Sequence, residues 1–117
     1  MTTEMDINLP SKIFRSNNLD IDCHINVDLS TYKIHAELFD RFGSSIELDT
    51  VNNGGATGEI IVTAGTGGQF SLHFAKDLTA LFHLISYLEI TLINASAKEY
   101  TVWFDIIKFT DNIYMRA

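Results

Sequence analysis

Residues 19–27 read LDIDCHINV and alternate strictly between apolar and polar side chains. A period of two is typical of a β-strand that buries one face and leaves the other in water. The apolar face comprises Leu19, Ile21, Cys23, Ile25 and Val27. This stretch therefore predicts a strand with Ile21, Cys23 and Ile25 buried.

The same alternation recurs along the rest of the chain. Short apolar-alternating segments are separated by polar or glycine-containing turns, among them DRFGSS, where Gly43 would supply a positive φ angle. The further strands expected are 32–38, 46–50, 59–64, 69–74, 87–94 and 100–109. The last of these is apolar on both faces, so we expect it centrally in a sheet, or with a bulge where Ile106 and Ile107 adjoin.

The period changes only in residues 75–86, AKDLTALFHLIS. Leu78, Leu81, Phe82 and Ile85 are spaced as on one face of a helix, and Asp77 stands at an N-cap position. One short helix is expected there. About seven short strands with one helix favour an all-β fold, a two-layer antiparallel sandwich, over an alternating α/β design.

Length and charge limit the function classes. A chain of 117 residues fits a single domain, whose core we place at about 12–111 with flexible or partner-bound tails at both ends. The net charge of −7 opposes binding to nucleic acid or anionic membranes. Cys23 is the single cysteine, and neither a signal peptide nor an apolar run of membrane-spanning length is present. These features predict folding in a reducing cytoplasm.

Six of the seven glycines lie within 52–70, NNGGATGEIIVTAGTGGQF. A phosphate-binding loop needs a following Lys-Ser/Thr and a helix, and a dinucleotide site needs three spaced glycines that open a helix. Here both glycine clusters lead into expected strands. We therefore interpret the glycines as turns and expect no nucleotide and no other cofactor.

The sequence contains residues that could bind a metal or catalyse a reaction, but no set of them forms a complete site. The polar face of the first strand, continued by Asn26 and Asp28, spaces its oxygens about 7 Å apart, too far for one cation without other ligands. No serine occupies a nucleophile elbow, and Cys23 lies on the apolar face. The four histidines, His24, His35, His73 and His83, lack metal-ligand spacing, and the acids Asp40, Glu47, Asp49 and Glu59 are interpreted as surface groups. We expect no metal and no enzymatic activity.

Two aromatic residues are candidates for contact with a partner. Phe39 and Trp103 are predicted to lie opposite the better apolar face of their strands. An exposed ring could stack on a sugar or anchor another protein. Exposure beside an acidic or amide group would favour glycan binding, whereas a broad self-complementary apolar patch would favour assembly.

Three stretches resemble the small immunoglobulin-like β-sandwich proteins of tailed bacteriophages, which occur in baseplates, tail fibres and related virion structures. The stretches are residues 27–48, 67–92 and 100–111. The matching positions are Asp28, Leu29, Ser30 and Tyr32 in a turn and strand, Gly68 and Phe70, Thr79 to Leu81, Tyr87, and finally Ile107 and Phe109. Thr31 replaces the usual glycine of the Asp-Leu-Thr-Gly turn, and the helical insert at 82–86 is longer than usual.

The resemblance implies an antiparallel immunoglobulin-like sandwich and a non-enzymatic virion structural protein of the tail or baseplate, made in the bacterial host cytoplasm. Its partners would be other virion proteins, including further copies of itself. A carbohydrate-binding or host-recognition module, acting on a host glycan, is the alternative, and an uncharacterised enzyme is a third. Ile113, Tyr114 and Met115 lie beyond the last expected strand, so we expect them, with Phe39 and Trp103, at an interface.

Overall fold

The computed structural model describes residues 5–10, 12–14, 17–50, 58–79, 82 and 84–110, without the side chains of 77 and 78. Within these residues nearly all regular structure is β-strand, which confirms the all-β expectation. Two helical turns, η1 (Leu29–Thr31) and α1 (Lys76–Thr79), lie in connections. The strands are β1 (Met5–Asn8), β2 (Ile13–Phe14), β3 (Leu19–Ile25), β4 (Lys33–Phe39), β5 (Ser45–Asp49), β6 (Gly58–Ala64), β7 (Gln69–Phe74), β8 (Ile85–Ile93) and β9 (Glu99–Thr110).

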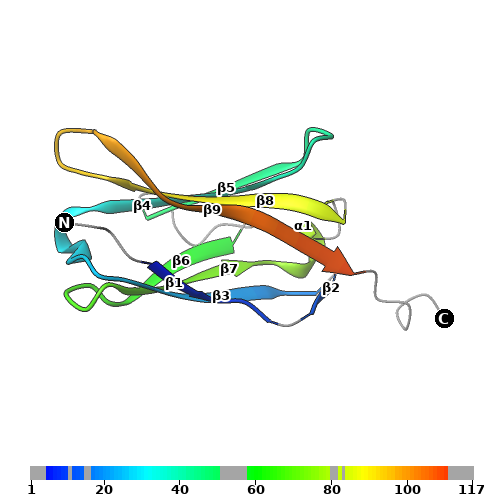
Figure 1. Cartoon of the computed structure of the whole chain (residues 1–117), viewed down its shortest axis with the longest axis horizontal. Coiled ribbons are helices and arrows are strands. Elements are labelled where there is room, and N and C mark those ends of the chain that lie inside the picture. The colour runs from blue at the N-terminus through cyan, green and yellow to red at the C-terminus, as the bar shows by residue number, and fades with distance from the viewer. Residues whose placement is uncertain are drawn as a thin grey trace.

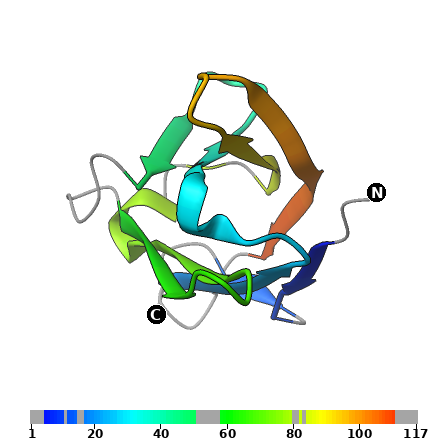
Figure 2. The same ribbon diagram turned by 90° about the vertical axis from the view of Figure 1, so that its left-hand side faces the viewer.

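The strands form two sheets that lie face to face (Figure 1). One sheet has the strand order β1-β3-β7-β6, and the other has the order β2-β9-β8-β4-β5. All pairings within the described residues are antiparallel except that of β2 with β9, which is parallel. The end-on view in Figure 2 shows the strands of both sheets surrounding one interior.

The N-terminal segment contributes a strand to each sheet. β1 pairs with β3, and β2 pairs with β9 on the other side of the interior. We expected a tail before residue 12, and this is wrong for Met5–Asn8: Met5 and Ile7 pack against the core. Their alternation with two polar residues lets one face of a short strand cover apolar surface. β1 and β2 raise the strand number in the described residues to nine, against about seven expected.

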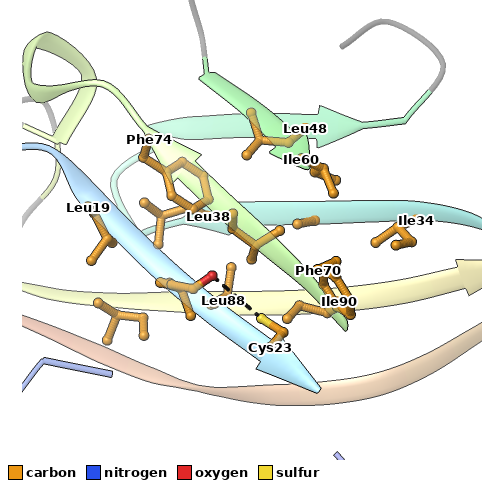
Figure 3. Packing of buried hydrophobic residues seen from close by; sticks show 14 of the residues in the cluster. Leu19, Cys23, Ile34, Leu38, Leu48, Ile60, Phe70, Phe74, Leu88 and Ile90 are labelled. Atoms are coloured by element: carbon orange, nitrogen blue, oxygen red, sulfur yellow. Dashed lines mark hydrogen bonds between the residues drawn. The ribbon is translucent and has the colours of Figure 1, made fainter. Parts of the chain in front are cut away.

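β3 supplies the centre of the core. Its side chains alternate between buried and exposed from Leu19 to Ile25, as the sequence predicts, although the strand ends two residues before Val27. Ile21 and Ile25 are fully buried and Cys23 is 5% exposed. Figure 3 shows Cys23 directed into the space between the sheets with Phe70 and Phe74 of β7 and Leu88 of β8. The predicted burial of this face is confirmed.

The connection between β7 and β8 is tied to the segment before β3. The buried Thr79 hydroxyl donates to the Asn17 carbonyl at 2.7 Å, and the Lys76 amide donates to the Asn18 side chain at 2.9 Å. α1 is shorter than the helix expected over 75–86, because Ile85 and Ser86 pair with β9 as the start of β8. Asp77 lies inside α1 and does not precede it, so the N-cap assignment is wrong.

β9 is the longest strand, and its irregularity lies elsewhere than expected. The register against β8 shifts so that Ile90 pairs with Trp103 and Thr91 with Thr101, which leaves Val102 as the extra residue. Of the two alternatives expected for this strand, the bulge at Ile106 and Ile107 is therefore wrong, and β9 lies between β2 and β8 in the sheet. Those two residues continue a regular ladder opposite Tyr87 and Ser86, with Ile107 inside and Ile106 outside. β8 pairs with β9 from Glu99 to Lys108, whereas β2 pairs only with the last two residues of β9.

The turn between β6 and β7 fixes the end of β3. The Ile25 amide donates to the Gly68 carbonyl at 2.9 Å, and the Leu29 amide donates to the Gly65 carbonyl at 2.8 Å. Gly68 has a φ of +71°, in the left-handed region where a side chain is strained. A Cβ at this position would also run into the Ile25 carbonyl. This glycine turns the chain and admits the backbone of β3, as the sequence predicts for its cluster.

Gly68→Ala should lower the free energy of unfolding by about 2 kcal/mol or more, since the left-handed backbone alone costs an L-residue about 1–2 kcal/mol and the clash adds to it. Gly67→Ala is the matched control, because its Cβ would meet nothing closer than Ala64 at 3.7 Å. Urea unfolding of both variants measures the difference. Equal stabilities would contradict the assigned role of Gly68.

Candidate functional site

The outward face of the five-stranded sheet has an apolar end. Successive side chains of a strand alternate between faces, so the residues next to buried Leu38, Leu88 and Ile107 point away from the core. At this end Tyr87 pairs with Phe39 on one side and with Ile106 on the other. These three form one row across β4, β8 and β9.

Three aromatic rings in this region contact one another. The centroids of Phe39 and Tyr87 are 5.6 Å apart, those of Tyr87 and Phe104 are 5.9 Å apart, and those of Phe39 and Phe104 are 6.3 Å apart. The first two pairs are stacked at interplanar angles of 28° and 14°. Such offset contacts fall in the range favoured by aromatic quadrupoles. The rings thus form an ordered cluster.

Two isoleucines extend the cluster into a patch. Ile85 is 54% exposed, Phe104 is 53% exposed and Ile106 is 45% exposed. We call Phe39, Ile85, Tyr87, Phe104 and Ile106 the aromatic patch. Large contiguous patches of exposed apolar surface occur at sites of contact with other molecules, so the aromatic patch is the candidate site.

A row of acids borders the aromatic patch. Glu37 on β4 pairs directly with Glu47 on β5 and with Glu89 on β8, and Glu89 in turn pairs with Phe104. Like charges at directly opposed positions destabilise a sheet. Ser45 donates a hydrogen bond to Glu37 at 2.8 Å, and His35 approaches Glu47 at 3.6 Å. We call Glu47, Glu37 and Glu89 the glutamate row.

The residues proposed from sequence are only partly brought together. Phe39 lies on the outward face as predicted, although it is half-buried among the other rings. Trp103 does not: it pairs with buried Ile90, packs against the core and lies on the same face of β9 as buried Ile107 and Phe109. Of the two rings named for glycan binding, Phe39 is the one on the outward face, and glycan binding through it stays a prediction. Ile113, Tyr114 and Met115 lie outside the described residues.

The main members of the aromatic patch were missed by sequence reasoning. Tyr87, Phe104 and Ile106 sit in strands that are apolar on both faces, so periodicity alone could not say which face was inside. The signal available was the odd–even alternation along the strand. Ile107 and Phe109 share one face, which is buried, so Phe104 and Ile106 must lie on the opposite face. That assignment requires knowing that the strand has a core on one side only.

The outward face of the four-stranded sheet is polar. His73 contacts Asp20 at 2.7 Å, and the Ser71 hydroxyl donates to Asp22 at 2.8 Å. Because the Ser71 hydroxyl donates to Asp22, Ser71 and His73 do not form a nucleophile–base pair. No group of three metal-ligating side chains occurs within the described part of the chain, and His83 lies outside it. On the edge strand β6, Ile61 is exposed on this outward face, and Val62, which pairs with buried Phe70, is exposed on the other side of the strand.

The carboxylates weighed as an acid pair serve as surface or turn groups. Asp40 accepts hydrogen bonds from the amides of Phe42 and Ser44 and so closes the β4–β5 turn, where Gly43 has a φ of +95°. Glu47 and Asp49 lie on β5, whereas Glu59 lies on β6 of the other sheet.

Comparison with known proteins identifies no family. Neither the protein-family models nor the curated protein sequences include one that matches this chain. A search of the described helices for one long and apolar enough to span a bilayer also finds none.

Exchanging Phe104 for alanine should cost about 1.5 kcal/mol of stability or less, since a half-exposed ring loses chiefly its aromatic contacts. Phe70→Ala, at a position 1% exposed in the core, should cost about 3–5 kcal/mol. Chemical denaturation of the two variants tests the assignment of Phe104 to the surface. A loss for Phe104→Ala as large as that for Phe70→Ala would refute it.

Cys23 should react very slowly with a bulky thiol reagent in the native protein and rapidly after unfolding. Burial, with a smaller effect of Asp22, raises the pKa of the Cys23 thiol to about 12, so little thiolate is present at neutral pH. Since the folded pKa is raised from 9.0, this group's contribution to stability is complete below pH 9 and is lost between pH 9 and about 12. Rapid native labelling would contradict the burial of β3.

Proposed function

We propose that this chain is a non-enzymatic structural protein of a tailed-bacteriophage particle, in or near the tail, that acts by binding other protein subunits. The observation that supports this best is the aromatic patch. Apolar rings held in an ordered cluster on an outward sheet face are typical of protein interfaces, where aromatic side chains are enriched. Burial against a partner would remove this apolar surface from water.

The arrangement of the strands supports the immunoglobulin-like part of the proposal. In that fold the first, second, fifth and fourth strands form one sheet, and the third, sixth and seventh form the other. If β1 and β2 are counted as two halves of the first strand, the order β1-β3-β7-β6 matches the first sheet, and β9-β8-β4 matches the second. β5 then adds a strand beside β4, as in variable-type domains.

The turn at Asp28, one of the positions that carry the resemblance, has a defined local structure. Asp28 accepts hydrogen bonds from the amide and the hydroxyl of Ser30, and these bonds lower the pKa of the Asp28 carboxyl. Leu29 is buried at the start of η1. An Asp-Leu-Ser sequence therefore places one side chain in the core and caps the turn that leads into β4.

Protein binding is favoured over glycan binding by the way the rings are arranged. A sugar stacks on a free ring face, whereas Phe39, Tyr87 and Phe104 stack on one another. Within the aromatic patch, the ring of Phe104 is the most exposed. Edges of clustered rings and isoleucine side chains make a surface better suited to another apolar protein surface.

Mass spectrometry of purified particles, produced from the genome that encodes this chain, tests the proposal. We expect peptides of the chain at a fixed ratio to the other tail proteins after gradient purification. The matched control is the lysate fraction freed of particles, which should hold only unassembled chain. Presence in that fraction alone, with none in particles, would contradict a virion role.

A further inference from the structure

We propose that the aromatic patch binds the same patch of a second copy of this chain, with a two-fold axis that crosses the strands at the level of Tyr87. This inference rests on the proposed assembly function and names the partner and its orientation. The inference rests on the residue pairing among β5, β4, β8 and β9 and on the placement of charge around the aromatic patch.

The register divides the outward face into rows that run across the strands. The glutamate row continues onto β9 at Phe104. The next row toward the end of the sheet is Phe39, Tyr87 and Ile106, and the row after that pairs Ile85 with Lys108. The apolar rows thus separate an acidic side from a side that bears a cation.

A second cation lies at the same end of the sheet as Lys108. Arg41 is exposed and lies two residues after Phe39, in the turn that joins β4 to β5. Figure 1 shows this turn at the end where β8 begins and β9 finishes. Next to the apolar rows, the outward face therefore has three carboxylates on one side and Lys108 on the other, with Arg41 in the turn at the Lys108 end, while His35 and Lys33 lie two and four residues beyond Glu37.

A two-fold axis between two facing sheets must lie in the plane of the interface. An axis across the strands reverses the row order, so the glutamate row of one copy lies over the Lys108 and Arg41 end of the other. An axis along the strands keeps the row order and brings the two glutamate rows together. Only the first is complementary in charge, and misplaced like charges cost several kcal/mol at an interface.

The axis across the strands also gives the distribution of residues that is usual in isologous interfaces, with apolar side chains at the centre and charged ones at the margin. Tyr87 and Ile106 lie at the axis and meet their own copies, so aromatic and apolar side chains fill the centre. The charged rows lie at the two margins, where a polar rim is usual. The repulsion within the glutamate row, unfavourable in a single chain, is then offset by cations of the second copy.

Charge reversal tests this pairing directly. Glu89→Lys and Lys108→Glu should each weaken dimerisation by about 10-fold or more in sedimentation equilibrium, whereas the double variant should recover to within a few-fold of the original chain. Glu59→Lys, on the other sheet, is the matched control and should leave the dissociation constant unchanged. Thermal unfolding of each variant checks that the fold is retained.

Crosslinking provides a second measurement that depends on geometry alone. Ile106→Cys lies at the axis and should be joined to its copy by a short bismaleimide, while buried Cys23 does not compete. Lys33→Cys is exposed on the same sheet face, six residues from Phe39, about 20 Å from the axis and hence about 40 Å from its copy. It should remain uncrosslinked.

A chain that stays monomeric at millimolar concentration would overturn the inference, as would a double variant that is not rescued or a Lys33→Cys crosslink as strong as that of Ile106→Cys. Growth into open fibres would also overturn it, because it requires a head-to-tail contact. A monomer that is nevertheless present in purified particles would refute only this pairing and leave the virion role intact.

Discussion

Burial of one side-chain face of every strand between the two sheets is the constraint on which the rest of the structure depends. The alternating segment Leu19–Ile25 meets β7 and the facing strand β8, and Cys23 lies among their side chains in Figure 3. The tight β6–β7 turn admits the end of β3, and Thr79 ties the next connection to the same region. Each strand of the second sheet is thereby left with one covered face and one free face.

The free face of the five-stranded sheet carries the aromatic patch, on which the proposed function rests. β8 and β9 are apolar on both sides, but the fold provides a core on one side only. Folding therefore leaves Phe104, Ile106 and Ile85 in contact with water, at a cost that a partner surface would remove. The polar outward face of the four-stranded sheet, with its Asp20–His73 and Asp22–Ser71 pairs, lacks such a cost over most of its area.

Period-two alternation was sufficient to predict β3, β4 and β7, since each has one apolar and one polar face. It failed where tertiary pairing decided the outcome. The helix expected around Phe82 was shortened because Ile85 and Ser86 gain a strand partner in β9, and the N-terminal residues became strands because two sheet edges were open to them. Trp103 was misplaced because β9 carries apolar side chains on both faces, so the pattern did not show that the face of Trp103, Ile107 and Phe109 is the buried one.

Our central claim is that the outward face of the five-stranded sheet is where this chain meets other protein. Hydroxyl-radical footprinting of the free, dilute chain and of the chain within purified particles measures this most directly. The account predicts that Tyr87, Phe104 and Ile106 become protected in particles, while Ile61 and Val62 on the other sheet keep their reactivity. Protection of Ile61 and Val62 with Phe104 left fully reactive would contradict it.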